Sequence, residues 1–496
     1  MRMGSFAKVA GAMLCIIAVH TLTAKTIYVD ASASGADDGS TWADAYVCLQ
    51  DALAAAEAGD EIHVAQGAYT PDVGKGRKKG NQRAYFNLKQ NVACLGGFPA
   101  GGGKPDARDP SAFATVLTGD LAGDDAEVIT GFELLADTTR AENAFHVVRA
   151  KDVDSSTILD GFVIAGGNSS SYTGAGMRLI AASPTIRNCT FTENCGACGP
   201  AIFMEKKSSP TIDNCLFTLN ASNGCCGAVG LRDSNPVFTN CVFSFNNAEQ
   251  AGAVRCVYSK PVFSNCTFVG NRCETNGGAV ECYASDAAFH RCRFYANFAE
   301  GDGGACFIHA ADPTWTNCVF VGNACAKEGG AIGACQHVSN PVLINCTLTA
   351  NTAKYYGGGL NIPGESKTTL INCIVWGNTD REGTGDHSQL QMRYIIAVNT
   401  CIQNLADPTR GTNIFGADPF FVSPPDDGGD GWADNPRTPE IDEGANDFYG
   451  DLRLAEGSCC IDAGTEETPE LAGYFDIEGN KRVLGPRIDV GAIEVR

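Results

Sequence analysis

The chain has 496 residues, of which 44% are apolar, and a formal net charge of −21 at pH 7. This length and composition are sufficient for a large buried core. The excess of acidic residues argues against nucleic acid as a partner, because binding to phosphates needs a basic surface.

Residues 1–24 resemble a secretory signal peptide. Arg2 and Lys8 form a basic start, 9–19 is a short apolar stretch, and Leu22–Ala24 resembles a cleavage site with small residues. Removal of two basic residues and no acidic one would change the net charge from −21 to −23. We therefore expect an exported protein, secreted or displayed at the cell surface, with no transmembrane span after cleavage.

Residues 25–120 are predicted to form an N-terminal cap and the first strands. Thr26–Asp30 and Glu61–Ala65 alternate as strands do, and Gly59 precedes the second of them. Between the two strands, apolar side chains recur at helical spacing, which predicts a short capping helix. These side chains are Tyr46, Leu49, Leu53 and Ala56.

The same opening carries a family resemblance. Tyr28–Asp30, Gly59–Val64 and Gly67–Tyr69 resemble the start of bacterial secreted parallel β-helix proteins of the pectin-lyase-like superfamily. The resemblance implies that the helix covers the open apolar end of a solenoid.

Residues 121–403 are predicted to form that solenoid, with a core array at 174–378. Eight copies of an Asn-Cys-x-Phe-x-x-Asn pattern recur every 25–28 residues. They begin at Asn188, Asn214, Asn240, Asn265, Arg291, Asn317, Asn345 and Asn372. Each unit also contains Gly-Gly-Ala and a Pro-apolar-apolar segment, which leaves room for three short strands and no helix. We predict an all-β, right-handed parallel β-helix of about ten coils of about 26 residues, roughly 50 Å long.

The pattern also predicts which side chains lie inside the coil. Cys189 and Phe191 are two residues apart and therefore share one face, which the recurrent phenylalanine marks as the interior. We expect a ladder of free, packed thiols, because stacked cysteines with parallel Cβ directions do not favour disulfide geometry. The ladder comprises Cys189, Cys215, Cys241, Cys266, Cys292, Cys318, Cys346 and Cys373. The flanking asparagines are expected to be structural, through left-handed backbone and amide bonds between coils.

Residues 404–496 are predicted to contain an acidic loop, 424–444, and a closing domain. Four short segments of this region resemble the terminal domain called choice-of-anchor Q, over about the last 45 residues. They are Asp451–Leu454, Gly457–Gly464, Asp476–Arg482 and Ile488–Glu494. The resemblance implies closure of an exported β-helix and assigns no catalytic residue.

Two outward columns follow the Gly-Gly-Ala corner, because the residues between inward positions must point out of the coil. The first column is Phe203, Gly230, Arg255, Glu281, Phe307 and Gly333, and the second column is Glu205, Arg232, Val257, Tyr283, His309 and Cys335.

Mixed charge beside aromatic rings suits a glycan groove, in which polar groups bind hydroxyls and carboxylates and a ring face packs on a sugar. The predicted ligand-binding residues are Arg232, Arg255, Glu281, Tyr283, Phe307 and His309. Glu281 and His309 are the candidates for catalytic acid and base, with Arg255 as a third catalytic candidate. The alternative is an ordinary solvated face.

The densest run of carboxylates lies in the acidic loop, with glycines between them that give a flexible backbone. Asp426, Asp427, Asp430 and Asp434 are the candidate ligands for calcium as a cofactor, although their spacing does not match an EF-hand. The alternative is a solvated loop.

A second group of cysteines follows the repeat strand on neighbouring coils. Cys198 and Cys225 come nearly into register, so a disulfide between them is the preferred interpretation. Free thiols and a zinc site with Cys195 and Cys226 are the alternatives, and the adjacent pair at 225–226 chelates a tetrahedral ion poorly.

The repeats also resemble those of chlamydial polymorphic outer-membrane proteins, as in Phe320–Asn323 followed by Gly329, Ala331 and Ile332. That resemblance implies a surface-displayed adhesive role. We therefore expect an exported monomer that binds a polysaccharide or cell-surface glycan. The alternatives are a polysaccharide lyase or glycoside hydrolase acting on an acidic polysaccharide, and a structural spacer without a ligand. The sequence leaves open whether the protein is an enzyme, because the aspartates of the array occupy different positions in their coils and are not expected to converge on one catalytic site.

Overall fold

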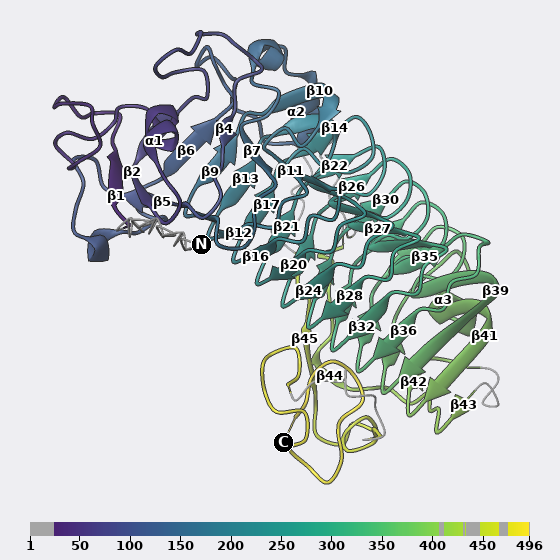
Figure 1. Cartoon of the computed structure of the whole chain (residues 1–496). Coiled ribbons are helices and arrows are strands. Elements are labelled where there is room, and N and C mark those ends of the chain that lie inside the picture. Colours follow the sequence, from purple (N-terminus) through teal and green to yellow (C-terminus); the bar gives the residue numbers. More distant parts are fainter. Residues whose placement is uncertain (1–23, 406–410, 430–431, 433–446, 466–474, 496) are drawn as a thin grey trace, which may run out of the picture.

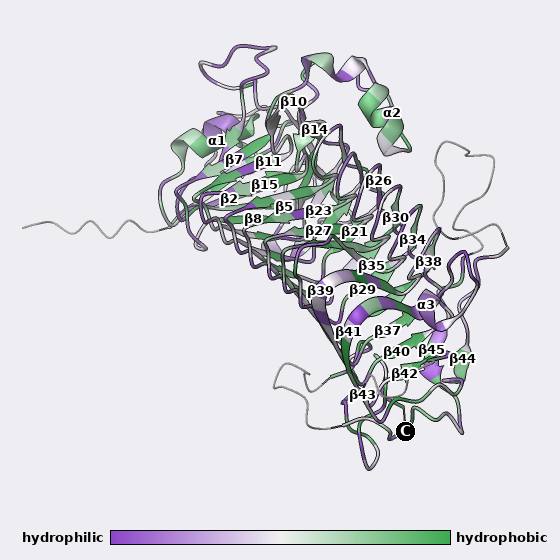
Figure 2. Ribbon diagram, turned by 90° about the vertical axis from the view of Figure 1, so that its right-hand side faces the viewer, coloured by the Kyte–Doolittle hydropathy of each residue, from purple (hydrophilic) through white to green (hydrophobic). Residues whose placement is uncertain are grey.

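The computed structural model describes residues 24–405, 411–429, 432, 447–465 and 475–495, apart from the side chains of 170–172. The chain winds into a right-handed parallel β-helix of about ten turns, with about 26 residues per turn, as predicted (Figure 1). Equivalent residues pair in register, so that Phe217 lies beside Phe243 and Phe243 beside Phe268. Figure 2 shows apolar strands joined by more polar corners.

The coils of the array before the last one each have four strands, one more than the sequence pattern predicts. The additional strand has only two residues in most coils and follows the second asparagine of the repeat, as Arg272–Cys273 follows Asn271. It pairs in parallel with its neighbours, as at Arg272 and Phe298. We name the four stacks of strands the first to fourth ladders, in the order in which the chain passes through them.

The first ladder consists of β4 (Phe86–Asn87), β7 (Val148–Lys151), β11 (Met177–Ile180), β15 (Ile202–Glu205), β19 (Val229–Arg232), β23 (Val254–Val257), β27 (Val280–Tyr283), β31 (Cys306–His309), β35 (Ile332–Ala334), β39 (Leu360–Ile371) and β41 (Leu390–Val398). The second ladder consists of β1 (Thr26–Val29), β2 (Glu61–Ala65), β5 (Ala93–Phe98), β8 (Ile158–Asp160), β12 (Thr185–Arg187), β16 (Thr211–Asp213), β20 (Val237–Thr239), β24 (Val262–Ser264), β28 (Ala288–His290), β32 (Thr314–Thr316), β36 (Val342–Ile344) and β43 (Gly411–Thr412). The long strands β39 and β41 pair within both ladders and join them into one sheet.

The third ladder consists of β3 (Gly67–Tyr69), β6 (Thr115–Thr118), β9 (Val163–Ala165), β13 (Thr190–Thr192), β17 (Leu216–Thr218), β21 (Val242–Ser244), β25 (Thr267–Val269), β29 (Arg293–Tyr295), β33 (Val319–Val321), β37 (Thr347–Thr349), β40 (Ile374–Trp376) and β42 (Cys401–Ile402). The fourth ladder consists of β10 (Asn168–Thr173), β14 (Cys195–Cys198), β18 (Ala221–Ser222), β22 (Asn247–Ala248), β26 (Arg272–Cys273), β30 (Phe298–Ala299), β34 (Ala324–Cys325) and β38 (Thr352–Ala353).

The predicted capping helix is present as α1 (Leu49–Ala55), beside the first strands (Figure 1). Leu49 and Leu53 are buried in the main hydrophobic core together with residues of β1 and β2. A second helix, α2 (Gly131–Ala136), has a capping box of Thr130 and Glu133 and lies against the fourth ladder. A third short helix, α3 (Asp386–Gln389), precedes β41. No helix in the described part of the chain is long and apolar enough to cross a membrane.

The interior of the array is built from columns of identical side chains, as the repeat predicts. All eight ladder cysteines are free and buried. Phenylalanine rings stack through successive coils, with centroid separations of 4.8 Å for Phe243 and Phe268 and again for Phe268 and Phe294. The repeat therefore specifies the hydrophobic core directly.

The two asparagines of each repeat have different roles. The first, such as Asn265, has positive φ and turns the chain. The second, such as Asn271 or Asn297, is fully buried, and its Nδ2 donates to the Oδ1 of the equivalent asparagine one coil on, at 2.9 Å for this pair. The amide ladder runs from Asn194 to Asn378 and ends on Gln389, which accepts at 2.8 Å.

The C-terminal segment lies along the side of the later coils (Figure 1). Its strands β44 (Phe421–Ser423) and β45 (Asp451–Leu454) pair antiparallel. The segment then covers the third ladder, where Arg293 donates to the carbonyl of Ile477 at 3.0 Å and the amide of Ala492 donates to Thr347 Oγ1 at 3.0 Å. The C-terminal segment thus covers an outer face as well as the region next to the last strands, and its assignment as a closing domain stays a prediction.

Candidate functional site

The first ladder places the predicted outward residues in register. Arg255 pairs with Glu281, and Glu281 pairs with Phe307, on β23, β27 and β31. Tyr283 pairs with His309 on the same strands. The backbone therefore brings the candidates together in two neighbouring columns, while their functional roles remain predictions.

The first column is covered, although its side chains point out of the coil. Glu281 is 8% exposed and Phe307 is 6% exposed. The corner before each strand lies against it: a Cβ at Gly303 would stand 3.1 Å from Cα of Phe307, and one at Gly277 would meet the carbonyl oxygen of Val280 at 2.6 Å. Both glycines have positive φ, which allows this close approach.

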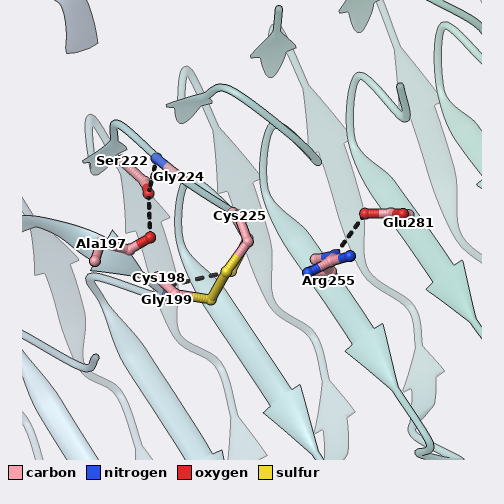
Figure 3. Close-up of a disulfide and its surroundings, with 9 residues drawn as sticks. Ala197, Cys198, Gly199, Ser222, Gly224, Cys225, Arg255 and Glu281 are labelled. Carbon is pink, nitrogen blue, oxygen red and sulfur yellow. Dashed lines mark hydrogen bonds and ion pairs between the residues drawn. A yellow bond between two sulfur atoms is a disulfide. The ribbon is translucent and has the colours of Figure 1, made fainter. Parts of the chain in front are cut away.

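Glu281 is held by an ion pair. Arg255 Nε lies 2.6 Å from Glu281 Oε2, from one coil to the next (Figure 3). A carboxylate that is buried and paired in this way is not available to a substrate as a general acid or base without breaking the pair. Phe307 likewise offers no open ring face to a sugar.

The second column is accessible and carries a row of rings, which we name the ring column: Tyr258, Tyr283, His309 and His337. Ring centroids are 6.0 Å apart between Tyr258 and Tyr283, 4.4 Å between Tyr283 and His309, and 4.4 Å between His309 and His337. Tyr258 is 60% exposed, His337 is exposed, and the two middle rings are half-buried. The four rings follow the rod over four successive coils.

Sequence reasoning identified Tyr283 and His309 but missed Tyr258 and His337. Both lie outside the strict register, since Tyr258 follows β23 and His337 follows β35. Positive φ at Tyr258 turns the chain where its ring joins the row. The available signal was an aromatic or imidazole ring within a few residues of the same strand end on four consecutive coils.

Electrostatics around the column are mixed. The pKa of His309 is lowered, mainly because burial disfavours the charged imidazole and also because His337 lies beside it. Arg232 is exposed and its guanidinium lies 5.8 Å from the ring centroid of Phe203. The face therefore combines aromatic and imidazole rings with an exposed guanidinium on the same ladder.

A pocket of about 440 Å³ opens further along the same ladder. Its lining includes Glu328 and Tyr356 from the corners, Asn361 from β39, and Gln391 and Arg393 from β41. A second pocket, of about 410 Å³, lies between the third ladder and the C-terminal segment, lined by Arg293, Tyr295, Asp451, Arg453 and Glu478 among others. The sequence did not indicate either, because both depend on segments far apart in the chain.

The predicted calcium ligands lie only in part within the described residues. Asp426 and Asp427 accept hydrogen bonds from the amides of Gly428 and Gly429, at 3.1 Å and 3.0 Å. Asp430 and Asp434 fall outside the described residues. Calcium binding by this loop stays a prediction.

The predicted disulfide is present. Cys198 and Cys225 are bonded, with Cα atoms 5.1 Å apart (Figure 3). They pack with Phe203, Cys226 and Ala251 in a small cluster outside the coil. The bond therefore fixes the corners that cover the start of the first column.

The chain also resembles known proteins. The family model described as a right handed beta helix region matches residues 175–336 and 278–407. The array is a right-handed β-helix. No curated protein sequence matches.

Solved structures resemble the chain at low identity. A pectate lyase, Pel9A, has a TM-score of 0.42 at 14% identity, covering 96% of this chain and 97% of that one. A rhamnogalacturonan lyase has a TM-score of 0.40 at 11% identity, covering 80% and 91%. XylC, solved in complex with xylose, has a TM-score of 0.38 at 11% identity, covering 95% and 98%. At these identities the function has to be derived from this chain's own residues.

Proposed function

We propose that the protein is exported and binds an extended polysaccharide along the ring column. The observation that carries the proposal is the row of four rings on successive coils, at centroid separations of 4.4–6.0 Å. Tyr283, His309 and His337 stack face to face, at interplanar angles of 24° and 27°, so they present their edges to solvent, and the hydroxyl and imidazole nitrogens on these edges can hydrogen-bond to sugar hydroxyls. Tyr258, 60% exposed and at 89° to Tyr283, is the ring whose apolar face can pack on the C–H groups of a sugar.

The surroundings of the column support a ligand that is held by both packing and polar contacts. Arg232 lies exposed on the first ladder. The pocket with Asn361, Gln391 and Arg393 lies on the same ladder, and its amide and guanidinium groups can donate to hydroxyls or carboxylates. A polysaccharide that follows the rod would meet rings first and polar groups further along.

The sequence supports the cellular setting of the proposal. The signal-like segment of residues 1–24 suits export, and the resemblances to choice-of-anchor Q domains and to polymorphic outer-membrane protein repeats suit display at the surface. The role is then adhesive or glycan-binding. A catalytic role for Glu281 is disfavoured by its buried pair with Arg255.

Affinity electrophoresis and calorimetry of the purified chain against neutral and acidic polysaccharides test the proposal. We expect one class of polysaccharide to bind, and the double variant Tyr258→Ala/Tyr283→Ala to lose at least about tenfold in affinity, since one tenfold step corresponds to about 1.4 kcal/mol. Phe245→Ala is the matched control, because Phe245 is a 51% exposed aromatic residue that follows β21 on the third ladder, on another face of the rod.

The same mixtures are assayed for new reducing or unsaturated ends. If the wild type cleaves a polysaccharide and the Glu281→Gln variant does not, the protein acts as an enzyme rather than as a glycan-binding protein. Binding that is unchanged in the double variant would remove the ring column from the function, and absence of binding across the panel would favour a spacer.

A further inference from the structure

His309, Cys335 and His337 form a compact cluster at the end of the ring column. One donor atom from each residue lies within 4.8 Å of the others. Cys335 Sγ is 3.3 Å from His337 Nδ1. His309 and Cys335 are half-buried and His337 is exposed, so solvent reaches the cluster.

The fold holds the three residues from two successive coils. His309 ends β31, and Cys335 follows β35 one coil further on. The amide of Cys335 donates to the carbonyl of Ile308 at 3.1 Å, which ties the two coils together at this point. After His337, Ser339 is fully buried and its amide donates to Ser366 Oγ at 3.0 Å. The backbone is thus anchored on both sides of the cluster.

The donor set has a defined metal preference. Two imidazoles and one thiolate are ligands for Zn²⁺ and related transition-metal ions, whereas Ca²⁺ and Mg²⁺ require oxygen. Bonds of about 2.0–2.3 Å in a tetrahedron place ligand atoms roughly 3.3–3.8 Å apart, which is within the 4.8 Å spread of the three donors. The rings of His309 and His337 are stacked at an interplanar angle of 27°, so they must tilt apart for their nitrogens to converge on one ion. Three protein ligands beside solvent leave a fourth position open.

Other sulfur clusters in the described residues are arranged differently. Cys198 and Cys225 form a disulfide, so their sulfur atoms are not free thiols that could bind an ion. Cys401, Cys459 and Cys460 lie where the C-terminal segment meets the last coils, and two of the three are buried. The cluster at His309 is the one that combines imidazoles with a thiol on the accessible face of the first ladder.

We propose that His309, Cys335 and His337 bind one Zn²⁺ or similar ion and leave its fourth position facing the polysaccharide surface. An ion there would bind a hydroxyl or carboxylate oxygen of a ligand that lies along the neighbouring Tyr283. The metal site is inferred from its three donor side chains alone, so it does not depend on the proposed glycan binding.

Titration of the metal-free full chain with Co²⁺, with the Cys198–Cys225 disulfide intact, tests the site, because a cobalt–thiolate bond has a charge-transfer absorption that reports sulfur ligation directly. We expect this band to saturate at about one equivalent, Cys335→Ser to abolish it, and His337→Ala to weaken binding about tenfold or more. Zn²⁺ should displace Co²⁺ and remove the band.

Two variants serve as controls. Cys459→Ser should keep the band, because it changes only the other open thiol cluster, and His387→Ala should keep it, because His387 is an exposed histidine elsewhere. Circular dichroism checks that each variant is folded. Absence of a band in the wild type, or a band that survives Cys335→Ser and disappears in Cys459→Ser, would overturn the proposal.

Discussion

Residues 281 and 283 lie two positions apart on β27 and point to the same side, yet their surroundings differ. Glu281 is covered by the corner of its coil and paired with Arg255, whereas the ring of Tyr283 lies in an accessible row. A second covered surface lies on the third ladder beneath the C-terminal segment. The comparison shows that a side chain directed out of a solenoid becomes a binding surface only where no corner or distant segment lies over it.

Removing the disulfide should have the largest effect on the covered column. Cys198→Ser/Cys225→Ser opens a loop of 27 residues and frees the corners around Phe203. We expect a loss of about 3 kcal/mol in the free energy of unfolding, measured by denaturant titration. Wild type with its disulfide reduced should have the same free energy of unfolding as the variant. Equal stability of oxidised wild type and variant would contradict the conclusion that the disulfide holds the corners over the first column.

Breaking the covered ion pair should have the next largest effect. Arg255→Ala leaves the carboxylate of Glu281 buried without its partner, and we expect a loss of about 2–3 kcal/mol in the free energy of unfolding. The double variant Arg255→Met/Glu281→Leu should recover most of that loss, because no buried charge remains. A single variant as stable as the wild type would mean that water reaches Glu281 freely.

The stabilisation provided by the C-terminal segment, which packs on the third ladder, should depend on pH. Burial raises the pKa of Glu494 from 4.5 to about 7, so the folded chain binds this proton more tightly than the unfolded chain. The resulting stabilisation is complete below about pH 4.5 and is lost as pH rises through 7, an effect of about 3 kcal/mol. Glu494→Gln should remove this dependence in unfolding measured across that range. Identical pH profiles for variant and wild type would contradict the assignment.

Truncating an exposed ring should have the smallest effect on stability. Tyr283→Ala should change the free energy of unfolding by no more than about 1 kcal/mol, because the ring is only half-buried outside the core. Thermal unfolding of both proteins measures this difference. A loss as large as that of Arg255→Ala would show that the ring column is a packing feature.

Much of the fold could be predicted from the sequence, because the same pattern of residues occurs in eight successive repeats. Cys189 and Phe191 had to share a face, and the interior ladders follow from that spacing. The fourth strand was missed because two residues give too short a pattern to recognise. The split between turn-forming Asn265 and hydrogen-bonding Asn271 appears only when the coils are stacked.

The alternation of inward and outward residues along a strand does not predict which outward surfaces are covered. Alternation gives the direction of a side chain, whereas cover depends on the path of a corner such as Gly303 or on a segment more than a hundred residues away, such as Ala492 on Thr347. One signal was available in the third ladder. One column of outward positions changes from Thr192, Thr218 and Ser244 in early coils to Tyr295, Val321 and Trp376 in later ones, where the C-terminal segment packs.

The most direct test compares the two columns in one binding experiment with the best polysaccharide from the panel. We predict that Tyr283→Ala loses about tenfold in affinity, whereas Arg255→Met/Glu281→Leu binds like the wild type. Loss of binding in the Arg255 and Glu281 double variant, with full binding by Tyr283→Ala, would contradict the account and place the function in the covered column.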